Sequence, residues 1–318
     1  MLLPDQAGTR RAIALWRAGA LVAFPTETVY GLGADASNAA AVGHIFRAKG
    51  RPTTNPLIIH VADIATAQRY AHFSDDAQRL ADAFWPGPLT LVLPVREGEG
   101  LSPLVTAGLH DVAIRIPDST LARDLLAWFG GAIAAPSANP SGRISPTSAA
   151  HVRAGLEGRI EAILDAGPCT VGVESTIVKP EIPALLRPGG LPVAAIEAAL
   201  GKPLSHGANA SKPTSPGQML SHYAPRLPLR LEVTSPDRSD LWLGFGPACD
   251  GAALNLSPSG DLHEAASNLF AHLHRLDTLA AAGTARSIAV APIPKSGLGQ
   301  AINDRLARAA APRDQKPA

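Results

Sequence analysis

Apolar positions in the first part of the chain follow two kinds of pattern. Short continuous apolar runs predict buried strands, because a run of that length between turn signals fits the interior of a sheet. These runs occupy residues 21–24, 57–59, 89–94, 112–116, 132–135 and 177–179. Apolar residues at helical spacing predict helices over 5–18, 38–48, 75–84, 119–129 and 192–200, with Ser74 as the N-cap of the third. The alternation of the two patterns predicts an α/β domain built on a mixed sheet.

A stretch rich in helix-breaking residues comes next. Nine of the seventeen residues 201–217 are Gly, Pro or Ser, a density that supports neither a helix nor a central strand. Beyond it, strands at 227–233, 241–245 and 288–291 and helices at 261–280 and 298–310 predict a second, smaller α/β domain. We therefore expect domains over 1–203 and 227–318, joined by a linker over 204–226.

Composition excludes several classes of protein. Of the 318 residues 46% are hydrophobic, which is enough apolar material for two cores. A formal net charge of +1 argues against a protein that holds nucleic acid through an overall basic surface. Cys169 and Cys249 lie outside any CxxC pair, which disfavours a disulfide scaffold or thiolate zinc site and favours a reducing compartment. The uncharged run 125–142 is broken by Gly and Pro, and no signal-peptide pattern precedes it, so we expect a cytoplasmic protein without membrane contact.

The most informative segment covers residues 36–62, which contain no acid. Arg47, Lys49 and Arg51 lie together in this segment, beside a predicted turn. In a nearly neutral protein such a cluster indicates a local anion site, for example for a polyphosphate. Favourable cations at the C-terminus of a helix would explain the same cluster. The segment alone leaves both interpretations open.

A second acid-free segment covers residues 125–156. After a predicted buried strand it carries small hydroxyls and an amide, in Ser137, Asn139 and Ser145. These groups can donate hydrogen bonds to phosphate or ribose oxygens, and a helix beginning near Thr147 adds backbone N–H donors. An ordinary Ser/Pro/Gly loop before a capped helix is the alternative.

Other cofactor and catalytic motifs are weak or missing from the sequence. Gly31, Gly33 and Ala36 form a GxGxxA pattern, but the first glycine comes too far after the predicted strand and no acid follows at 50–60. That spacing disfavours a dinucleotide site. The sequence contains no P-loop and no HExxH motif, and the histidines of the predicted helix 261–280 do not form a ligand pair on one face.

A series of short motifs, in order along the chain, resembles the threonylcarbamoyl-AMP synthase family. They are residues 25–33, 49–51, 55–57 with His60, 85–90, 112–115, 135–142, 145–147, 174–176, 186–189 and 222–225. The linker and the second domain resemble the longer, two-domain form of that family. The resemblance covers nearly the whole chain. It implies a YrdC-like twisted open mixed sheet with flanking helices, followed by a smaller Rossmann-like α/β C-terminal domain.

The resemblance also implies roles for residues at matching positions. Lys49 and Arg51 would be catalytic and would surround the nucleotide together with Ser137 and Asn139. The other ATP contacts would be Asn55, Ser145, Arg187 and Tyr223. L-Threonine would be held by Thr28, His60, Arg115 and Ser175. The linker 204–226 would act as an active-site lid.

Some positions leave room for other interpretations. Where the family pattern often carries an ATP-contacting threonine, this chain has Asp111, whose charge would repel phosphate, so Asp111 is left out of the site. Ala135 has no side-chain donor, so a substrate contact there would use the backbone. From the residues alone, Arg115 could form a structural ion pair instead, and His60 could be a hydrogen-bonded core histidine.

The implied activity is that of a nucleotidyltransferase. It would make threonylcarbamoyl-AMP and pyrophosphate from L-threonine, bicarbonate and ATP, for threonylcarbamoyladenosine formation in tRNA. Mg²⁺ is expected on the phosphates, although no acid cluster reveals its protein ligands. The product is expected to pass to the tRNA threonylcarbamoyl-transfer machinery, without stable nucleic-acid binding by this chain.

Two other functions compete with this one. An RNA-binding module is disfavoured by the balanced charge and by an aromatic content of 4%. A different carbamoyl or adenylyl transferase on the same fold is the nearer alternative, and the identity of the acyl substrate separates the two.

Overall fold

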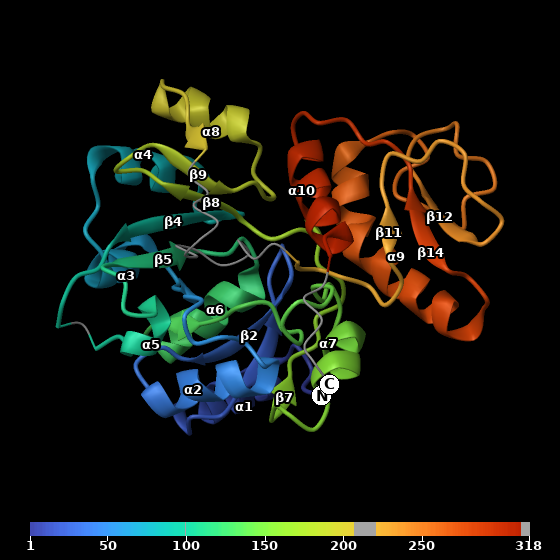
Figure 1. Ribbon diagram of the computed structural model, residues 1–318. Helices are drawn as coiled ribbons and strands as arrows, with labels where there is room; N and C mark the ends of the chain where they lie inside the picture. Colours follow the sequence, from blue (N-terminus) through green and yellow to red (C-terminus); the bar gives the residue numbers. More distant parts are fainter. Residues whose placement is uncertain (99, 207–220, 313–318) are drawn as a thin grey trace.

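The computed structural model describes residues 1–98, 100–206 and 221–312, which form two α/β bodies (Figure 1). The larger body is built on a mixed sheet whose described strands follow the order β10-β9-β8-β4-β5-β3-β6-β2-β1-β7. These strands are β1 (Val22–Pro25), β2 (Tyr30–Asp35), β3 (Ile58–His60), β4 (Leu89–Pro94), β5 (Asp111–Arg115), β6 (Ile133–Ala134), β7 (Ala162–Ile163), β8 (Thr176–Lys179), β9 (Ala184–Arg187) and β10 (Ser205–His206). The prediction of an α/β fold with a large mixed sheet is confirmed.

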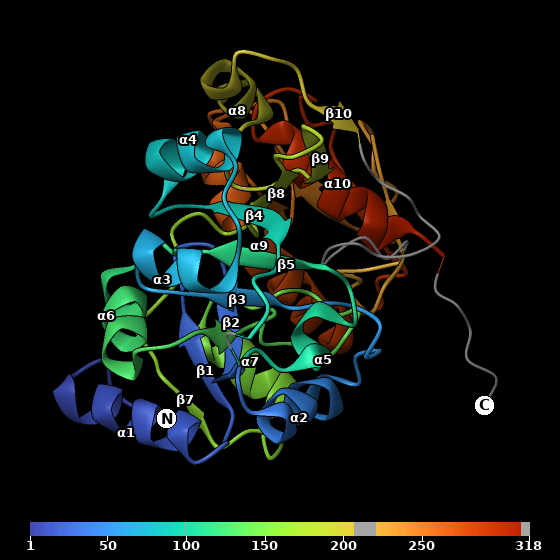
Figure 2. The same cartoon turned by 90° about the vertical axis from the view of Figure 1, so that its left-hand side faces the viewer.

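Helices flank this sheet (Figure 2). They are α1 (Gln6–Arg17), α2 (Ala39–Lys49), α3 (Ile64–Tyr70), α4 (Asp75–Phe84), α5 (Pro103–Thr106), α6 (Thr120–Phe129), α7 (Ala149–Leu156) and α8 (Val193–Leu200). The Ser74 side chain accepts a hydrogen bond from the Ala77 N–H and caps α4, as predicted. Gly50 ends α2 in the left-handed region at φ 61°, so the chain turns directly after Lys49.

The centre of the large sheet is apolar on both faces. On one face the register partners Ile59, Ile114 and Leu91 are fully buried. On the other face the next set of register partners is buried as well: Ile58, Ala113 and Val92. Strands buried on both faces carry continuous apolar sequence, which explains why the apolar runs predict them correctly.

The strand β2 is not predicted by the apolar pattern, because two glycines interrupt it. Gly33 is required for packing, since an added Cβ would lie 2.8 Å from the Trp16 ring and 3.0 Å from the Phe24 ring. The GxGxxA pattern therefore belongs to a strand that makes room for aromatic side chains. The edge strands β7 and β10 and the neighbouring strand β9 are also missing from the prediction, because two to four residues are too few for a periodic signal.

The second body carries a parallel sheet whose described strands follow the order β11-β14-β12-β13. The strands are β11 (Leu229–Arg230), β12 (Asp240–Gly244), β13 (Leu254–Asn255) and β14 (Ser287–Val290), and the helices are α9 (Leu262–Ala282) and α10 (Gly299–Ala310). The parallel sheet, with α9 connecting β13 to β14 and α10 following β14, agrees with the predicted smaller, Rossmann-like α/β domain. No helix in the described part of the chain has both the length and the apolar character that crossing a bilayer requires.

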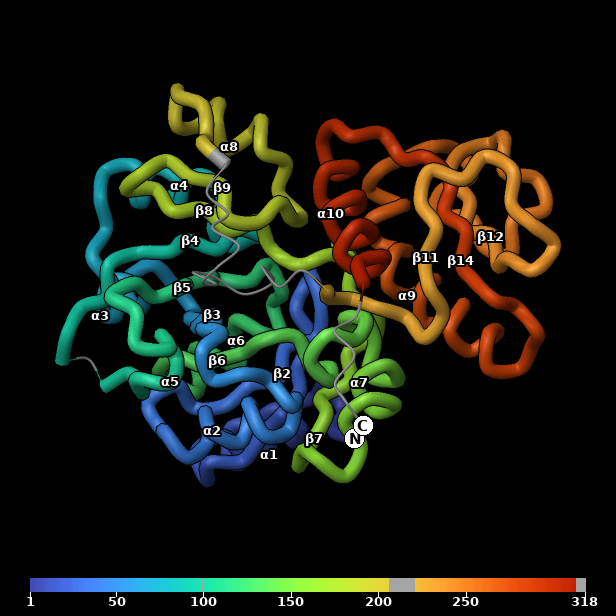
Figure 3. Tube along the Cα trace, in the orientation of Figure 1, coloured from blue at the N-terminus to red at the C-terminus, as the bar shows by residue number. Residues whose placement is uncertain are grey.

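The two bodies share one apolar cluster. Val29, Ile144 and Val173 of the first body pack in the same cluster as Leu269 and Phe270 of α9. Figure 3 shows that the trace after residue 220 starts beside the first body and runs into the second. The first body is therefore covered on this side by α9.

The predicted linker and lid, 204–226, lie partly outside the described residues. In the described part, Tyr223 is buried, and the Ala224 N–H donates to the Gly142 carbonyl oxygen. The chain after residue 220 is thus tied to the loop that carries Ser137 and Asn139. The domain bounds and the lid stay predictions.

Candidate active site

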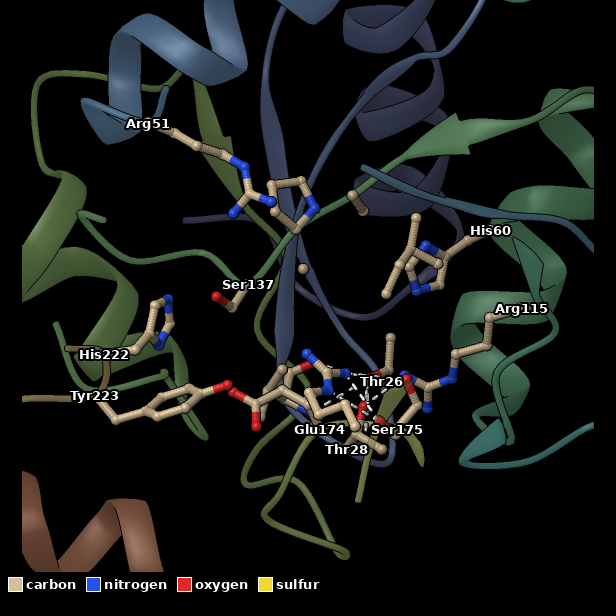
Figure 4. A pocket seen from close by; sticks show the side chains of 16 residues that line it. Thr26, Thr28, Arg51, His60, Arg115, Ser137, Glu174, Ser175, His222 and Tyr223 are labelled. Carbon is tan, nitrogen blue, oxygen red and sulfur yellow. Dashed lines mark hydrogen bonds between the residues drawn. The ribbon is translucent and has the colours of Figure 1, made fainter. Parts of the chain in front are cut away.

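A pocket opens where the large sheet meets the residues around Tyr223 (Figure 4). Figure 4 shows Arg51, His222 and Tyr223 on one side of it and His60 and Arg115 on the other. We call this cavity the central pocket. Its lining residues are Thr26, Thr28, Val29, Gly31, Arg51, Ile58, His60, Arg115, Ala135, Pro136, Ser137, Glu174, Ser175, Arg187, His222 and Tyr223.

Most of the predicted site residues line this pocket. They are Thr28, Arg51, His60, Arg115, Ser137, Ser175, Arg187 and Tyr223. The other predicted residues are buried but are not lining residues: Lys49, Asn55, Asn139 and Ser145. The structure thus brings together side chains that the sequence separates by more than half of its length.

Strand register places the Arg115 end of the pocket. His60 and Arg115 are the last residues of β3 and β5, which are adjacent parallel strands, and they are register partners. Residues paired in this way project to the same face of the sheet. Both side chains therefore reach the pocket from the carboxyl-terminal ends of their strands, which is where ligands bind in open α/β sheets.

Arg115 is held by fixed partners. Its Nη1 donates to Thr28 Oγ1 at 2.7 Å, its Nη2 donates to Glu27 Oε1 at 2.5 Å, and its Nε donates to the Gly87 carbonyl oxygen. The ion pair with Glu27 is buried on both sides. The structural ion pair considered from the sequence is therefore present, and Arg115 lines the pocket as well.

The Glu27 carboxylate was not predicted as part of the site. Its Oε2 has no hydrogen-bond partner among the described residues. A buried charge is stable only beside an opposite charge, so a buried arginine implies an acid that lies beside it in the fold. Glu27 lies in the motif 25–33, and that position was the available signal.

Hydroxyl groups surround the same end. Ser175 Oγ and Thr90 Oγ1 lie 2.7 Å apart, and Thr26 Oγ1 and Thr28 Oγ1 lie 2.8 Å apart. All of these side chains are buried. Their protons can rotate, so the set can either donate to or accept from a small polar ligand.

His60 is a neutral imidazole. Burial and the neighbouring Arg115 lower its pKa to about 3. Its ring packs edge-on against Phe24, with the ring centroids 6.1 Å apart. Its Nδ1 has no hydrogen-bond partner among the described residues. The ring therefore packs as a core side chain. It also brings to the pocket a nitrogen atom that has no partner among the described residues.

Arg51 marks the opposite end of the pocket. Its Nη2 donates to the Pro56 carbonyl oxygen at 2.8 Å and its Nε to the Asn55 carbonyl oxygen at 3.2 Å. Burial lowers the pKa of Arg51 to about 10, which still leaves it a cation near neutrality. Arg187 also lines the pocket, and its Nη2 donates to the Ser175 carbonyl oxygen at 2.8 Å.

Lys49 lies beneath the loop that carries Ser137. Its Nζ donates to the carbonyl oxygens of Ser137 and Asn139, each at 2.5 Å. Burial, followed by the charge of Arg51, holds its pKa well below the usual value. Lys49 therefore joins the two acid-free segments that the sequence predicts as an anion site.

Two predicted amides have spare acceptors. Asn139 Nδ2 donates to the carbonyl oxygens of Pro140 and Arg143, which fixes the loop. The Oδ1 atoms of Asn55 and Asn139 are buried and have no partner among the described residues. Buried amide oxygens without partners are costly, so a ligand that donates to them would be favoured.

Glu174 is the carboxylate among the lining residues. Its Oε1 accepts from Ser145 Oγ at 2.5 Å and its Oε2 accepts from Arg305 Nε at 2.8 Å. Burial alone would raise its pKa, but Arg305, Arg187 and the Ser145 hydrogen bond outweigh burial and lower the pKa to about 2. Glu174 is therefore ionised. The sequence offered it only within the motif 174–176.

Asp111 does not take part in the pocket. It begins β5, and its carboxylate pairs with Lys179 at 2.5 Å. The Ala135 N–H donates to the Ile58 carbonyl oxygen, so this backbone donor is already used. Among the described residues, no group of three His, Cys, Asp or Glu side chains is arranged to hold a metal ion.

Comparison with known proteins identifies the family. The Sua5/YciO/YrdC family model, described as "Telomere recombination", matches residues 14–189. The model described as "Threonylcarbamoyl-AMP synthase, C-terminal domain" matches residues 191–311. The two matches together cover both bodies of the structure.

Individual relatives agree. The threonylcarbamoyl-AMP synthase of Bacillus subtilis is 51% identical over 236 residues, 72% of this chain and 67% of the relative. That of Pyrococcus abyssi is 40% identical over 94% of this chain and 93% of the relative. The crystal structure of P. abyssi Sua5 complexed with L-threonine superposes with a TM-score of 0.87 at 39% identity, covering 96% of this chain and 95% of that one. The chain therefore belongs to the threonylcarbamoyl-AMP synthase family, in its two-domain form.

Proposed function

We propose that the central pocket binds L-threonine at its Arg115 end and ATP at its Arg51 end. The observation that carries this assignment is the presence of two buried guanidinium groups at opposite sides of one cavity, with hydroxyls beside them. A guanidinium fork suits the carboxylate of an amino acid. Arg51, Arg187 and Ser137 suit a chain of phosphates.

Membership of the family makes the chain an adenylyl-transferring enzyme. It forms threonylcarbamoyl-AMP and pyrophosphate from L-threonine, bicarbonate and ATP, for threonylcarbamoyladenosine formation in tRNA. In the reaction we propose, the threonine amine condenses with bicarbonate and loses water to give a carbamate. A carbamate oxygen then attacks the α-phosphorus, the bond to the bridging oxygen breaks, and pyrophosphate leaves with the electron pair.

The pocket suits this chemistry because the nucleophile is already an anion. No strong base is needed for the transfer step. The residues must hold two anions close together and neutralise the charge that accumulates on the phosphates. Arg51 is placed to neutralise charge directly, and Lys49 is placed to fix the Ser137 loop.

Threonine recognition is assigned to Thr28, His60, Arg115 and Ser175. Arg115 would bind the carboxylate, because Glu27 and Thr28 hold its guanidinium in one orientation. The neutral His60 ring is suited to accept a hydrogen bond from the ammonium or hydroxyl group. The L-threonine complex of the P. abyssi relative supports this choice of amino acid.

Nucleotide recognition is assigned to the remaining predicted residues. Arg187 and Tyr223 line the pocket, and the buried amide oxygens of Asn55 and Asn139 are suited to accept from the adenine or ribose. Ser145 would contribute to nucleotide binding in one of two ways: by holding Glu174 through their hydrogen bond, or by rotating its hydroxyl toward the ligand.

Mg²⁺ would enter with the nucleotide. Among the described residues that line the pocket, Glu174 is the carboxylate, and both of its oxygens already have partners. The donor set therefore does not fit a metal held by the protein. Mg²⁺ would be bound by phosphate oxygens and water, as hard cations in nucleotide sites commonly are.

The closing element and the fate of the product are also proposals. Residues 204–226 would cover the pocket as a lid between the domains 1–203 and 227–318, since Tyr223 already lines it and an acyl-adenylate needs protection from water. The product would pass to the tRNA threonylcarbamoyl-transfer machinery. A cytoplasmic location fits the two free cysteines, Cys169 and Cys249.

The assignment is tested with ATP, L-threonine and isotope-labelled bicarbonate. Mass spectrometry should detect threonylcarbamoyl-AMP carrying the label, with one pyrophosphate released per product. A labelled adenylate of a different amino acid, formed in preference to threonine, would indicate another carbamoyl or adenylyl transferase. Salt-sensitive RNA binding without amino-acid-dependent ATP turnover would support the RNA-binding alternative.

A further inference from the structure

A side chain of the C-terminal body reaches the wall of the central pocket. Arg305 lies on α10, and its side chain is 0% exposed. Figure 1 shows α10 on the side of the second body that faces β8 and β9. Arg305 Nε donates to Glu174 Oε2 at 2.8 Å, and Nη1 donates to the Pro188 carbonyl oxygen at 2.7 Å. Both acceptors belong to the first body.

Glu174 creates an electrostatic problem for a phosphate ligand. It lines the pocket together with Arg51 and Arg187, it is buried, and it is ionised. A buried carboxylate repels a polyphosphate strongly, because solvent screens little of the interaction. Ser145 donates a hydrogen bond to it but carries no charge. A cation is needed to cancel the charge, and Arg305 supplies the ion pair.

Arg305 also supports a second pocket residue. Its guanidinium carbon lies 5.4 Å from the centre of the Tyr223 ring, a cation–π distance. Figure 4 shows the Tyr223 side chain pointing toward Glu174. One arginine therefore contacts two of the residues that line the pocket, Glu174 and Tyr223.

We propose that Arg305 is a positioning residue through which the C-terminal domain completes the nucleotide end of the active site. It cancels the charge of Glu174 and holds Tyr223, without contacting the reacting atoms itself. This inference rests on the proposed placement of ATP at the Arg51 end. It assigns the second domain a role in substrate binding beyond that of a cover.

The test uses full-length protein and steady-state kinetics in ATP and in L-threonine. Arg305→Met should raise the KM for ATP by roughly 30-fold or more, because a buried charge loses its partner. The KM for threonine should change by less than about 3-fold, since that end of the pocket does not contact Arg305. Arg308→Met is the matched control. Arg308 lies on the same helix and, like Arg305, donates to Asp304, but its side chain does not pair with Glu174.

A rescue experiment separates positioning from simple packing. In the double variant Glu174→Gln/Arg305→Met both charges are gone, and ATP binding should recover to within about 5-fold of the parent, because neutral replacements of a buried ion pair are well tolerated. Arg305→Lys should lie between the parent and Arg305→Met, since it keeps the charge without the fork. The double variant also covers the case in which Arg305→Met does not fold.

Three results would overturn the inference. They are an unchanged KM for ATP in folded Arg305→Met, an equal loss for ATP and threonine, and a double variant as poor as the single one. The proposed function fails separately, when the parent protein shows no threonine-dependent ATP turnover at all.

Discussion

Lys49 Nζ lies 2.5 Å from the carbonyl oxygen of Ser137, although 88 residues separate them in the chain. The same ammonium group reaches the Asn139 carbonyl oxygen. This contact brings together the two segments that contain no acid, and it gives Lys49 a structural task that its sequence position does not reveal. The lysine organises the loop that carries Asn139 and the pocket residue Ser137.

Replacing Lys49 should therefore affect both stability and nucleotide binding. Lys49→Met removes the side-chain donor of the buried Asn139 carbonyl oxygen and one of two donors to the Ser137 carbonyl oxygen, which costs about 1–3 kcal/mol in the free energy of unfolding. It should also raise the KM for ATP, because the Ser137 loop loses its anchor. Denaturant unfolding and ATP titration measure the two effects. Arg47→Met, an exposed cation on the same helix, is the control, and an ATP KM equal to that of the control would contradict the anchoring role.

Replacing Arg115 should weaken threonine binding selectively. Arg115→Ala is expected to cost about 2–5 kcal/mol in kcat/KM for threonine, because a desolvated guanidinium loses its carboxylate partner. The same change leaves Glu27 buried without a counter-charge and so destabilises the fold. Adding Glu27→Gln should restore stability but not threonine dependence. If the double variant regains normal threonine kinetics, Arg115 does not bind the substrate.

Amino-acid selectivity should follow from the hydroxyl-lined end of the pocket. Valine lacks the threonine hydroxyl and would lose its hydrogen bonds to the polar groups that line this end, so its kcat/KM should fall by about 10⁴ or more. Serine lacks only a methyl group and should be disfavoured by about 10–200-fold. Competition assays with mass-spectrometric detection give both ratios. Equal use of valine and threonine would exclude hydroxyl recognition.

Stability should decrease as the pH falls below the usual histidine pKa. Burial and the stacked His151 ring, 3.9 Å away, lower the pKa of His274 to about 3, although its hydrogen bond to the Ser145 carbonyl opposes the shift. Between the unfolded value near 6.5 and the folded value near 3, the unfolded state binds the extra proton. Unfolding free energy is therefore lost as pH falls through this window, by up to about 1.4 kcal/mol per pH unit for one histidine.

The measurement is urea unfolding between pH 7.5 and pH 5. His274→Gln should show a shallower decline than the parent protein, because one buried group no longer titrates. The exposed His263 on the same helix provides the control, His263→Gln, which should keep the parental slope. Identical slopes in all three proteins would remove His274 as a source of the pH dependence.

The extent of the sequence-based prediction has a physical explanation. Central strands such as β4 and β5 are visible in the sequence because burial on both faces requires continuous apolar residues. The strand β2 is hidden because Gly33 must leave space for Trp16, which removes the apolar signal. Edge strands of two residues carry no periodicity at all.

The sequence predicted which residues form the site better than it predicted which hydrogen bonds and ion pairs they make. The resemblance located Arg51, Arg115 and Ser137, and the structure places them around one cavity. No local pattern indicates that Glu174 pairs with Arg305, because the partners lie 131 residues apart and in different bodies. Likewise, the position of Lys49 next to Arg51 does not indicate that its side chain turns beneath a loop.

The apolar cluster shared by the two bodies makes their folding interdependent. Val29, Ile144 and Val173 are covered by α9. The first domain expressed alone would therefore expose an apolar surface directly beside its pocket, which Val29 also lines. Such a fragment should self-associate, whereas the intact chain should melt in one cooperative transition. The two domains should therefore lose stability together when either one is removed or replaced.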